Sequence, residues 1–276
     1  MSELWSRLGF LAIALVVYRI GTHIPIPGIN PEQVAALFQQ SQGTILQYFN
    51  LFSGGALERM SIFALSVVPY ISSAIVMQLF SNSVPYLQEL KKDGQAGRNK
   101  ITQYTRYGTV IFALIQSSAL TVTLQTAGLI DAGSIFSAFV AVISIVTGTM
   151  FLMWLGEQIS ERGIGNGISI IIATSIITGV PRAFGQALEQ TQQGDLNYLL
   201  LIVLAVLTLL VVAFVVFVEN AQRKITVNYA QRNQVRGMIQ APSSFLPLKL
   251  NMSGVIPAIF ASTFLLFPAS LSSWFG

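Results

Sequence analysis

The chain has 276 residues, of which 53% are hydrophobic and only 9% are charged, and its formal net charge is +4. Soluble domains are about 25% charged, so this composition indicates an integral membrane protein, and long apolar runs favour helices over a β-barrel. The absence of cysteine excludes disulfides and thiol chemistry. Because His23 is the single histidine, a metal site of histidines and cysteines is also excluded, and we place His23 in an interfacial loop.

Seven apolar runs predict seven membrane-spanning helices and therefore an all-α, polytopic fold. Arg19 lies near the end of the first run, where we expect its long side chain to reach the membrane interface. The runs are residues 8–20, 60–80, 108–126, 135–155, 168–177, 198–218 and 256–274.

Residues 49–79 are apolar but do not form one clean span. A Gly-Gly pair at 54–55 interrupts the start, a Glu-Arg pair at 58–59 adds charge, and Pro69 lies inside the remaining apolar part. The pattern predicts a short half-helix, a hinge just after the charged pair, and then a spanning helix. Broken backbone at membrane depth is tolerated only where protein buries it or where it lines an aqueous path. A structural re-entrant loop and a segment beside a conduction path both remain open.

The positive charges indicate the orientation of the chain. The loops at residues 81–107 and 219–249 hold most of the lysines and arginines. Because cytoplasmic loops of membrane proteins are rich in these residues, the N-terminus and both basic loops are predicted to be cytoplasmic. The loops either only set this topology or also form a docking surface for an acidic or ribonucleic partner.

The predicted spans lack the residues that several function classes need. No aspartate or glutamate lies centrally in a span, which argues against a proton-driven pump and against intramembrane hydrolysis by paired carboxylates. The glycine-rich run at 163–167 lacks the preceding strand and the Lys-Ser/Thr pair of a nucleotide loop. We interpret it as a turn in which Asn166 caps the following helix.

The remaining candidates for function are apolar. Val67 and Ile71 are four residues apart, as are Ile168 and Ile172, so each pair shares one helix face. Stiff β-branched side chains of this kind form either a narrow apolar constriction or ordinary helix packing, and the spacing does not separate the two.

Eight motifs resemble the SecY family of bacterial protein-conducting channels, and they follow the family's order through the whole chain. They are IPIPG (24–28), FSGGAL (52–57), SIFAL (61–65), PYISS (69–73), QYTRYG (103–108), TGTMFLMWLGEQI (147–159), ERGIGNGISIII (161–172) and NMSGVIPAIFAS (251–262). The family has ten spans in two pseudo-symmetric halves around a pore. The resemblance implies that residues 1–188 are the five-helix first half and residues 189–276 an incomplete second half. We expect the last three spans to lie outside this sequence.

The resemblance also implies roles for particular residues: a re-entrant plug half-helix at 49–60 that blocks the pore from outside, an apolar pore ring, and a lateral gate toward lipid. The gate lies between spans two and three on one side and spans seven and eight on the other. The implied plug residues are Phe49, Asn50, Phe52, Ser53, Gly54, Gly55, Ala56, Leu57, Glu58 and Arg59. The implied pore ring is Val67, Ile71, Ile168, Ile172 and Ile259, and the implied gate residues are Gln78, Gln116 and Ser117.

The resemblance implies a passive channel subunit, without enzymatic activity or cofactor, that passes unfolded secretory polypeptides across the bacterial cytoplasmic membrane and releases apolar segments into the lipid bilayer. The implied partners are the SecE and SecG subunits, a signal sequence, and the SecA motor ATPase or a ribosome on the basic loops. The implied docking residues are Lys91, Lys92, Arg98, Lys100, Arg106, Arg223, Lys224, Arg232, Arg236 and Lys249. The alternative is a secondary transporter for a small solute, with residues 49–60 as its re-entrant substrate loop.

Overall fold

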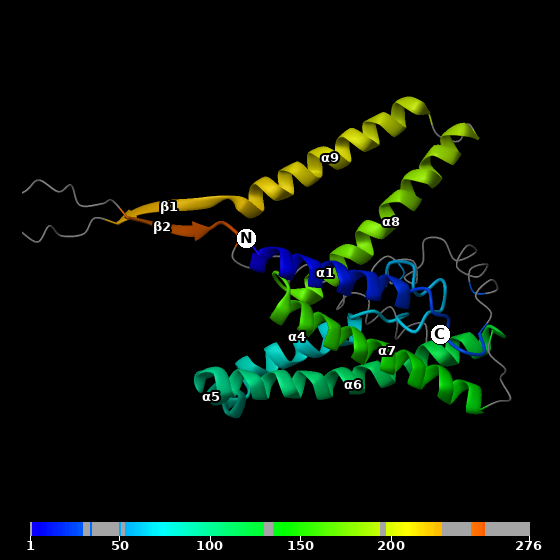
Figure 1. Ribbon diagram of the computed structural model, residues 1–276, viewed down its shortest axis with the longest axis horizontal. Helices are drawn as coiled ribbons and strands as arrows, with labels where there is room; N and C mark the ends of the chain where they lie inside the picture. The colour runs from blue at the N-terminus through cyan, green and yellow to red at the C-terminus, as the bar shows by residue number, and fades with distance from the viewer. Residues whose placement is uncertain are drawn as a thin grey trace, which may run out of the picture. The chain divides into compact units, whose positions relative to one another are not determined.

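The computed structural model describes residues 2–29, 34, 50, 53–129, 135–193, 197–227 and 244–251. This described part of the chain is mostly helical, with one pair of strands (Figure 1). The elements are α1 (Ser2–Gly21), α4 (Val68–Ser83), α5 (Pro85–Lys92), α6 (Gly94–Thr126), α7 (Ile135–Arg162), α8 (Gly167–Gln192), α9 (Tyr198–Asn220), β1 (Gln222–Val227) and β2 (Ser244–Lys249).

Among the described residues, five helices are long and apolar enough to cross a membrane: α1, α6, α7, α8 and α9. The most apolar of them, α9, agrees closely with the sixth predicted span. The side chain of Asn197 caps it by accepting the N–H of Leu199 at 3.2 Å. The seventh predicted span, residues 256–274, lies outside the described residues.

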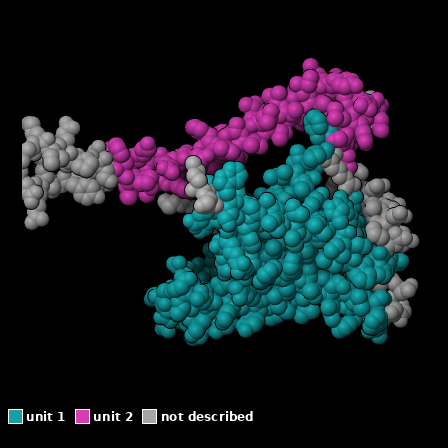
Figure 2. Space-filling model, viewed as in Figure 1, with its two compact units in different colours: residues 1–184, 263–276 teal, residues 185–262 magenta. Residues whose placement is uncertain are grey.

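The described residues divide into two compact units, one up to residue 184 and one from residue 185 (Figure 2). In the first unit, α6 packs against α4, α5 and α7, and α1 packs against α7. Small side chains in membrane helices allow such close backbone approach, and positions four apart lie on one helix face. α6 carries a row of small buried side chains with this spacing: Thr105, Thr109, Ala113, Ser117 and Thr121.

The contact between α4 and α6 shows how close this approach is. The hydroxyl of Ser73 on α4 donates a hydrogen bond to the backbone carbonyl of Thr105 on α6 at 2.7 Å. A Cβ atom added to Gly108 of α6 would collide with the same hydroxyl. Glycine at this position therefore lets the two helices meet without displacing the hydrogen bond.

The second predicted span begins later than predicted, because α4 starts at Val68 and not at Met60. Residues 53–67, which we call the turn segment, consist almost entirely of turns after Ser53. Two non-glycine residues in it, Met60 and Ser66, have φ angles of +43° and +50°. These left-handed conformations are incompatible with a continuous right-handed helix. The structure therefore has a longer irregular segment in place of the predicted hinge.

Backbone pairing with the loop after α1 holds the turn segment in this form. The N–H of Ile26 donates to the carbonyl of Met60 at 2.8 Å, and the N–H of Ile62 donates to the carbonyl of Ile24 at 3.0 Å. The two strands of this short bridge run antiparallel. The pairing satisfies backbone groups that a helix would otherwise satisfy internally.

The apolar core beside this bridge joins the loop after α1, the turn segment and the facing ends of α6 and α7. Burying an aliphatic side chain of this kind stabilises a fold by about 1.5–3 kcal/mol. The buried core residues are Ile26, Ile29, Val34, Leu57, Met60, Ala64, Leu124, Ala141 and Ile145.

The two basic loops contain regular structure that the hydropathy pattern did not predict. The first, residues 81–107, holds α5 and the first turns of α6. The second, residues 219–249, begins and ends with strands β1 and β2, which pair antiparallel with Gln222 opposite Lys249. The mostly helical membrane architecture is confirmed, with this hairpin as an addition.

Candidate functional site

The start of the turn segment, where the plug was predicted, is tied together by its own polar groups. The hydroxyl of Ser53 donates to the carbonyl of Asn50 at 3.0 Å and accepts the N–H of Leu57 at 3.2 Å. The side chain of Asn50 accepts the N–H of Glu58 at 3.1 Å through Oδ1 and donates to its Oε2 at 3.2 Å through Nδ2. Among the residues predicted as plug, Phe49 and Phe52 lie outside the described residues.

Gly54 and Gly55 provide the sharp turn in this segment, with φ angles of +65° and +81°. Glycine adopts such angles without steric cost. Gly54 also lies against α8, since an added Cβ would lie 3.1 Å from Cα and 3.2 Å from the carbonyl oxygen of Ser175. No atom of the residues that the structure describes lies within 4 Å of the corresponding position on Gly55. Gly54 therefore lies in close contact with α8.

Tyr18 joins α1 to α8 behind this contact. Its side chain is only 1% exposed, and its hydroxyl lies 2.5 Å from Oγ of Ser175. Because the Ser175 hydroxyl donates to the carbonyl of Ile171 at 2.8 Å, its oxygen is left to accept the proton of Tyr18. The carbonyl of Ser53 is a second, more distant acceptor for the tyrosine hydroxyl at 3.4 Å. The ring of Tyr18 stacks on Phe63 of the turn segment, with centroids 6.1 Å apart.

Arg19 lies half-buried beside Tyr18 and points at the turn segment. Its Nη1 donates to the carbonyl of Gly54 at 3.4 Å and to Oγ1 of Thr178 at 3.5 Å. We had expected this side chain to extend to the membrane interface, whereas the structure gives it two partners inside the protein. Both bonds are long, and neither partner carries a charge.

His23 lies in the turn after α1, as the predicted loop position required. Its Nε2 is 2.9 Å from Nη1 of Arg59, and its Nδ1 is 2.9 Å from the carbonyl oxygen of Arg19. An arginine only donates, so Nε2 accepts, and the proton is on Nδ1. The imidazole thus connects the end of α1 to the turn segment.

The described residues of the predicted pore ring lie at the starts of α4 and α8. Val67 directly precedes α4 and is 2% exposed, and Ile172 is 8% exposed. Ile71 and Ile168 are half-buried, and the side chain of Ile168 lies against the position where a Cβ on Gly156 of α7 would be. Ile259 lies outside the described residues.

The three predicted gate residues differ in their surroundings. Gln78 is exposed near the end of α4. Ser117 is fully buried in the row of small residues on α6, where its hydroxyl donates to the carbonyl of Leu114 at 3.2 Å. Its neighbour Gln116 has a buried Oε1 with no hydrogen-bond partner among the described residues.

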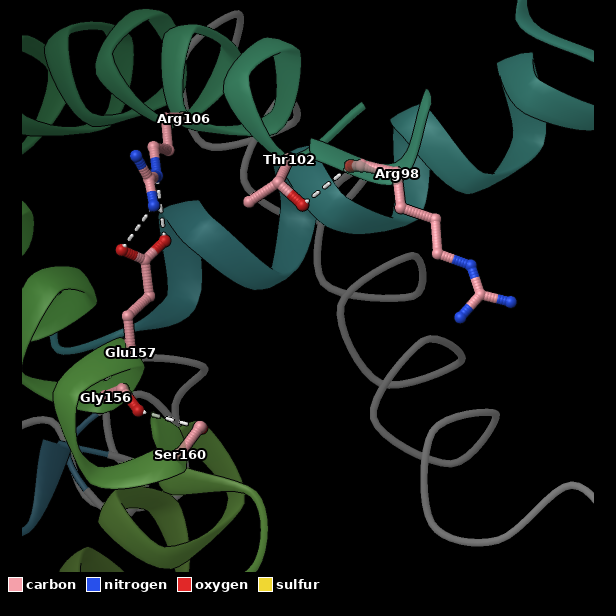
Figure 3. Close-up of polar contacts among 6 residues, drawn as sticks. All are labelled: Arg98, Thr102, Arg106, Gly156, Glu157 and Ser160. Carbon is pink, nitrogen blue, oxygen red and sulfur yellow. Dashed lines mark hydrogen bonds and ion pairs between the residues drawn. The ribbon is translucent and has the colours of Figure 1, made fainter. Parts of the chain in front are cut away.

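The predicted docking residues of the first basic loop are exposed, but one of them is paired. Arg106 on α6 makes a bidentate ion pair with Glu157 on α7, with distances of 2.9 Å and 2.8 Å (Figure 3). Figure 3 also shows the side chain of Arg98 directed away from this pair. Lys91, Lys92 and Lys100 are exposed on the surface of α5 and α6.

In the second basic loop, Arg223 and Lys224 lie on β1 and Lys249 lies on β2, and all three are exposed. Arg232 and Arg236 lie outside the described residues. The basic side chains of this loop that the structure describes are therefore presented from two paired strands.

Asn166 caps α8, as the interpretation of the glycine-rich run required. Its Oδ1 accepts the N–H of Ile168 at 3.1 Å and the N–H of Ser169 at 3.3 Å. Sequence reasoning missed other polar residues, namely Tyr18, Ser175, Thr178 and Glu157. A signal was present in α8, where Ser175 and Thr178 are three residues apart on one face of an apolar helix.

Comparison with known sequences gives consistent matches along the chain. The SecY family model matches residues 61–276. Protein translocase subunit SecY of Pseudomonas aeruginosa is 58% identical over the whole chain, which spans 62% of that relative. The SecY subunits of Buchnera aphidicola subsp. Acyrthosiphon kondoi and Escherichia coli K12 are each 55% identical, and the chain spans 79% and 63% of their lengths. The chain thus covers about three fifths of the P. aeruginosa and E. coli proteins.

Solved structures show the same fold. A protein-conducting channel of 19% identity superposes with a TM-score of 0.67, over 95% of this chain and 56% of the other. A SecY protein whose plug domain stabilises the closed state of its channel superposes with a TM-score of 0.70, over 97% of this chain and 57% of the other, again at 19% identity. The family match, the relatives and the shared fold agree: the chain is a multi-pass membrane protein that belongs to the SecY family.

Proposed function

We propose that this chain forms part of a passive protein-conducting channel, which passes unfolded polypeptides across a membrane and releases their apolar segments into lipid. The observation that carries the proposal is the turn segment of a SecY-family chain, folded into turns and buried against α1 and α8 directly before α4. Irregular backbone at membrane depth is tolerated only inside protein or beside an aqueous path. A plug is the role that accounts for both its burial and its irregular form.

In this proposal, residues 49–60 are the plug, and Val67, Ile71, Ile168, Ile172 and Ile259 form the ring. An apolar ring of stiff side chains contacts a passing chain without specific hydrogen bonds, so it accepts many sequences. When closed, it excludes water and therefore ions. The solved SecY channel in which a plug domain stabilises the closed state and maintains a membrane seal supports this assignment.

A lateral gate containing Gln78, Gln116 and Ser117 would let apolar segments of the passenger leave the pore. The driving force is the transfer of apolar surface from water to lipid. The buried, unpartnered Oε1 of Gln116 supports a site that rearranges, because a buried acceptor without a donor is costly and gains a partner on opening.

We infer that energy and completion of the channel come from partners. The SecE and SecG subunits would complete the complex, and SecA or a ribosome would dock on the basic loops at residues 81–107 and 219–249. A superposed relative is the Sec61 channel of a canine ribosome-channel complex, which supports ribosome docking. The excess of positive charge in these loops supports a cytoplasmic N-terminus in a bacterial cytoplasmic membrane. Residues 1–188 and 189–276 would belong to the two halves of the channel.

A site-specific photocross-link tests the proposal. A photoreactive residue is placed at Ile168 of the full-length protein in its complex, and a secretory polypeptide is stalled in transit. We expect a cross-link from Ile168 to the passenger and none from Leu204, an exposed residue of α9. Absence of the Ile168 cross-link, with the passenger demonstrably engaged, would contradict the assigned path.

The substitution Ile168→Asn tests the ring separately. An amide in the apolar ring would hydrate it, so we expect the variant to favour the open state and to transport polypeptides with defective signal sequences. If transport of such polypeptides matched that of the parent protein, Ile168 would be a packing residue against Gly156 only.

A further inference from the structure

Two neighbouring residues of α1 and two residues of α8 lie against the start of the proposed plug. We call Tyr18, Arg19, Ser175 and Thr178 the plug seat. Ser53 and Gly54 are the residues of the turn segment that face it. All six lie in the first compact unit, and Tyr18, Ser53 and Ser175 are at most 1% exposed.

The tyrosine sets the geometry of the seat. Its hydroxyl joins Ser175 of α8, and its ring stacks on Phe63, which stacks in turn on Phe151 of α7 with centroids 5.9 Å apart. The tyrosine thus fixes α8 relative to α1 at the level where Gly54 lies against Ser175. Loss of the hydroxyl alone would leave the ring stack in place while releasing Ser175.

The arginine connects the seat to the plug directly. A charged side chain within a membrane helix is costly unless its donors are satisfied. Among the described residues Arg19 makes no ion pair, and its hydrogen-bond partners there are the Gly54 carbonyl and the Thr178 hydroxyl. If the turn segment moved away, the guanidinium would lose the carbonyl and keep only the hydroxyl. The charge therefore favours the seated position of the plug.

We propose that Tyr18 and Arg19 are positioning residues that hold the plug in its closed position through Ser175, Thr178 and the backbone of Gly54. This inference rests on the proposed function, since it assigns the residues that control the same plug. It predicts that the closed state weakens when the guanidinium donors or the tyrosine hydroxyl are removed, without loss of the fold.

The experiment measures exposure of the plug directly. Ser53→Cys is introduced into the full-length complex, in a background without other cysteines, and its labelling by a maleimide is timed in detergent. This thiol is unique within the 276 residues, because the sequence has no cysteine, and it is buried while the plug is seated. The variants are Arg19→Gln, Arg19→Lys and Tyr18→Phe. The control on the same helix is Arg7→Gln, because Arg7 is exposed and pairs with Glu3 among the described residues.

We expect Arg19→Gln to accelerate labelling about tenfold, as the loss of a hydrogen bond from a charged donor would. Arg19→Lys should restore slow labelling because, unlike glutamine, lysine retains a positively charged donor. Tyr18→Phe should accelerate labelling several-fold, and Arg7→Gln should match the parent. Melting temperatures within the scatter of the parent would separate this effect from unfolding. Equal labelling rates in the parent, Arg19→Gln and Tyr18→Phe would overturn the inference, as would Arg19→Lys labelling as fast as Arg19→Gln.

Polypeptide transport by the same complexes is measured in parallel. A parent complex that fails to pass any polypeptide would contradict the proposed function, whereas the labelling ratios would still report whether Tyr18 and Arg19 hold the segment. The proposed function and the proposed role of Tyr18 and Arg19 can therefore be contradicted independently of each other.

Discussion

Replacing Gly54 by alanine should displace the turn segment from α8 through two separate effects. The residue has a φ of +65°, which costs an alanine about 1–2 kcal/mol. Its new Cβ would also lie 3.1 Å from Cα and 3.2 Å from the carbonyl oxygen of Ser175, both of them backbone atoms of a helix that cannot rotate away. Crowding of this kind costs about 1–3 kcal/mol.

The neighbouring glycine provides the matched control. Gly55 has a φ of +81°, so alanine there carries the same kind of backbone strain, but no atom of the described part of the chain lies within 4 Å of its Cβ position. Gly55→Ala should therefore cost only about 1–2 kcal/mol, and the difference between the two variants measures contact with α8 alone. A difference of about 1–3 kcal/mol corresponds to a change of roughly 5- to 150-fold in the population of the displaced turn segment.

The assay is ion conductance of the full-length complex in planar bilayers, combined with labelling of Ser53→Cys in each background. We expect the Gly54→Ala complex to conduct more often and to label faster than the Gly55→Ala complex. If both variants behaved alike, strain within the turn would explain the result, and contact between Gly54 and α8 would have no part in closing the channel.

Three further predictions follow from other contacts. Deleting residues 50–59 from the full-length protein should raise ion leak or relax the requirement for a functional signal sequence, and no change in either assay would count against a plug. Glu157→Gln should lower stability by only about 0.5–1 kcal/mol, because Arg106 is 45% exposed and solvent screens the pair; thermal unfolding at low and high salt checks this. Gly148→Ala should destabilise the folded protein by about 3 kcal/mol, since the new Cβ would collide with the carbonyl of Ile62. Gly185→Ala on α8 meets no described atom within 4 Å and should stabilise the fold by about 0.5–1 kcal/mol in the same unfolding assay.

Hydropathy located the long apolar helices among the described residues, but it did not give the ends of all of them. The predicted and observed ends of α9 agree closely because apolar residues start and stop there together with the helix. α6 begins at Gly94 rather than at residue 108, since the polar turns before the membrane continue the same helix without a breaker. α8 likewise runs through Pro181 to Gln192. Hydropathy detects the membrane-embedded part of a helix, whereas the ends of the helix depend on caps and hydrogen bonds.

The broken segment before α4 was predictable as a break, because adjacent glycines and a charged pair are visible in the sequence. Its extent was not, because Met60 and Ser66 have positive φ angles that their residue types do not suggest. The pairing of Ile26 with Met60 joins positions that only the fold brings together. The partners of Arg19 could not be predicted for the same reason, since one of them is a backbone carbonyl, and a carbonyl has no sequence signature.

The strengths of these contacts suggest which end of the proposed plug moves first. At the end of the proposed plug, the backbone N–H of Ile26 donates to Met60 at 2.8 Å and that of Ile62 donates to Ile24 at 3.0 Å, and Met60 is buried in the apolar core. At its start, Arg19 reaches Gly54 only at 3.4 Å. Hydrogen bonds weaken with length, so the Gly54 end is held by less free energy than the Met60 end. A plug that must reopen for each passenger needs a small free-energy difference between its two positions. We therefore expect rotation about residues near Met60, with the Gly54 end leaving α8 first.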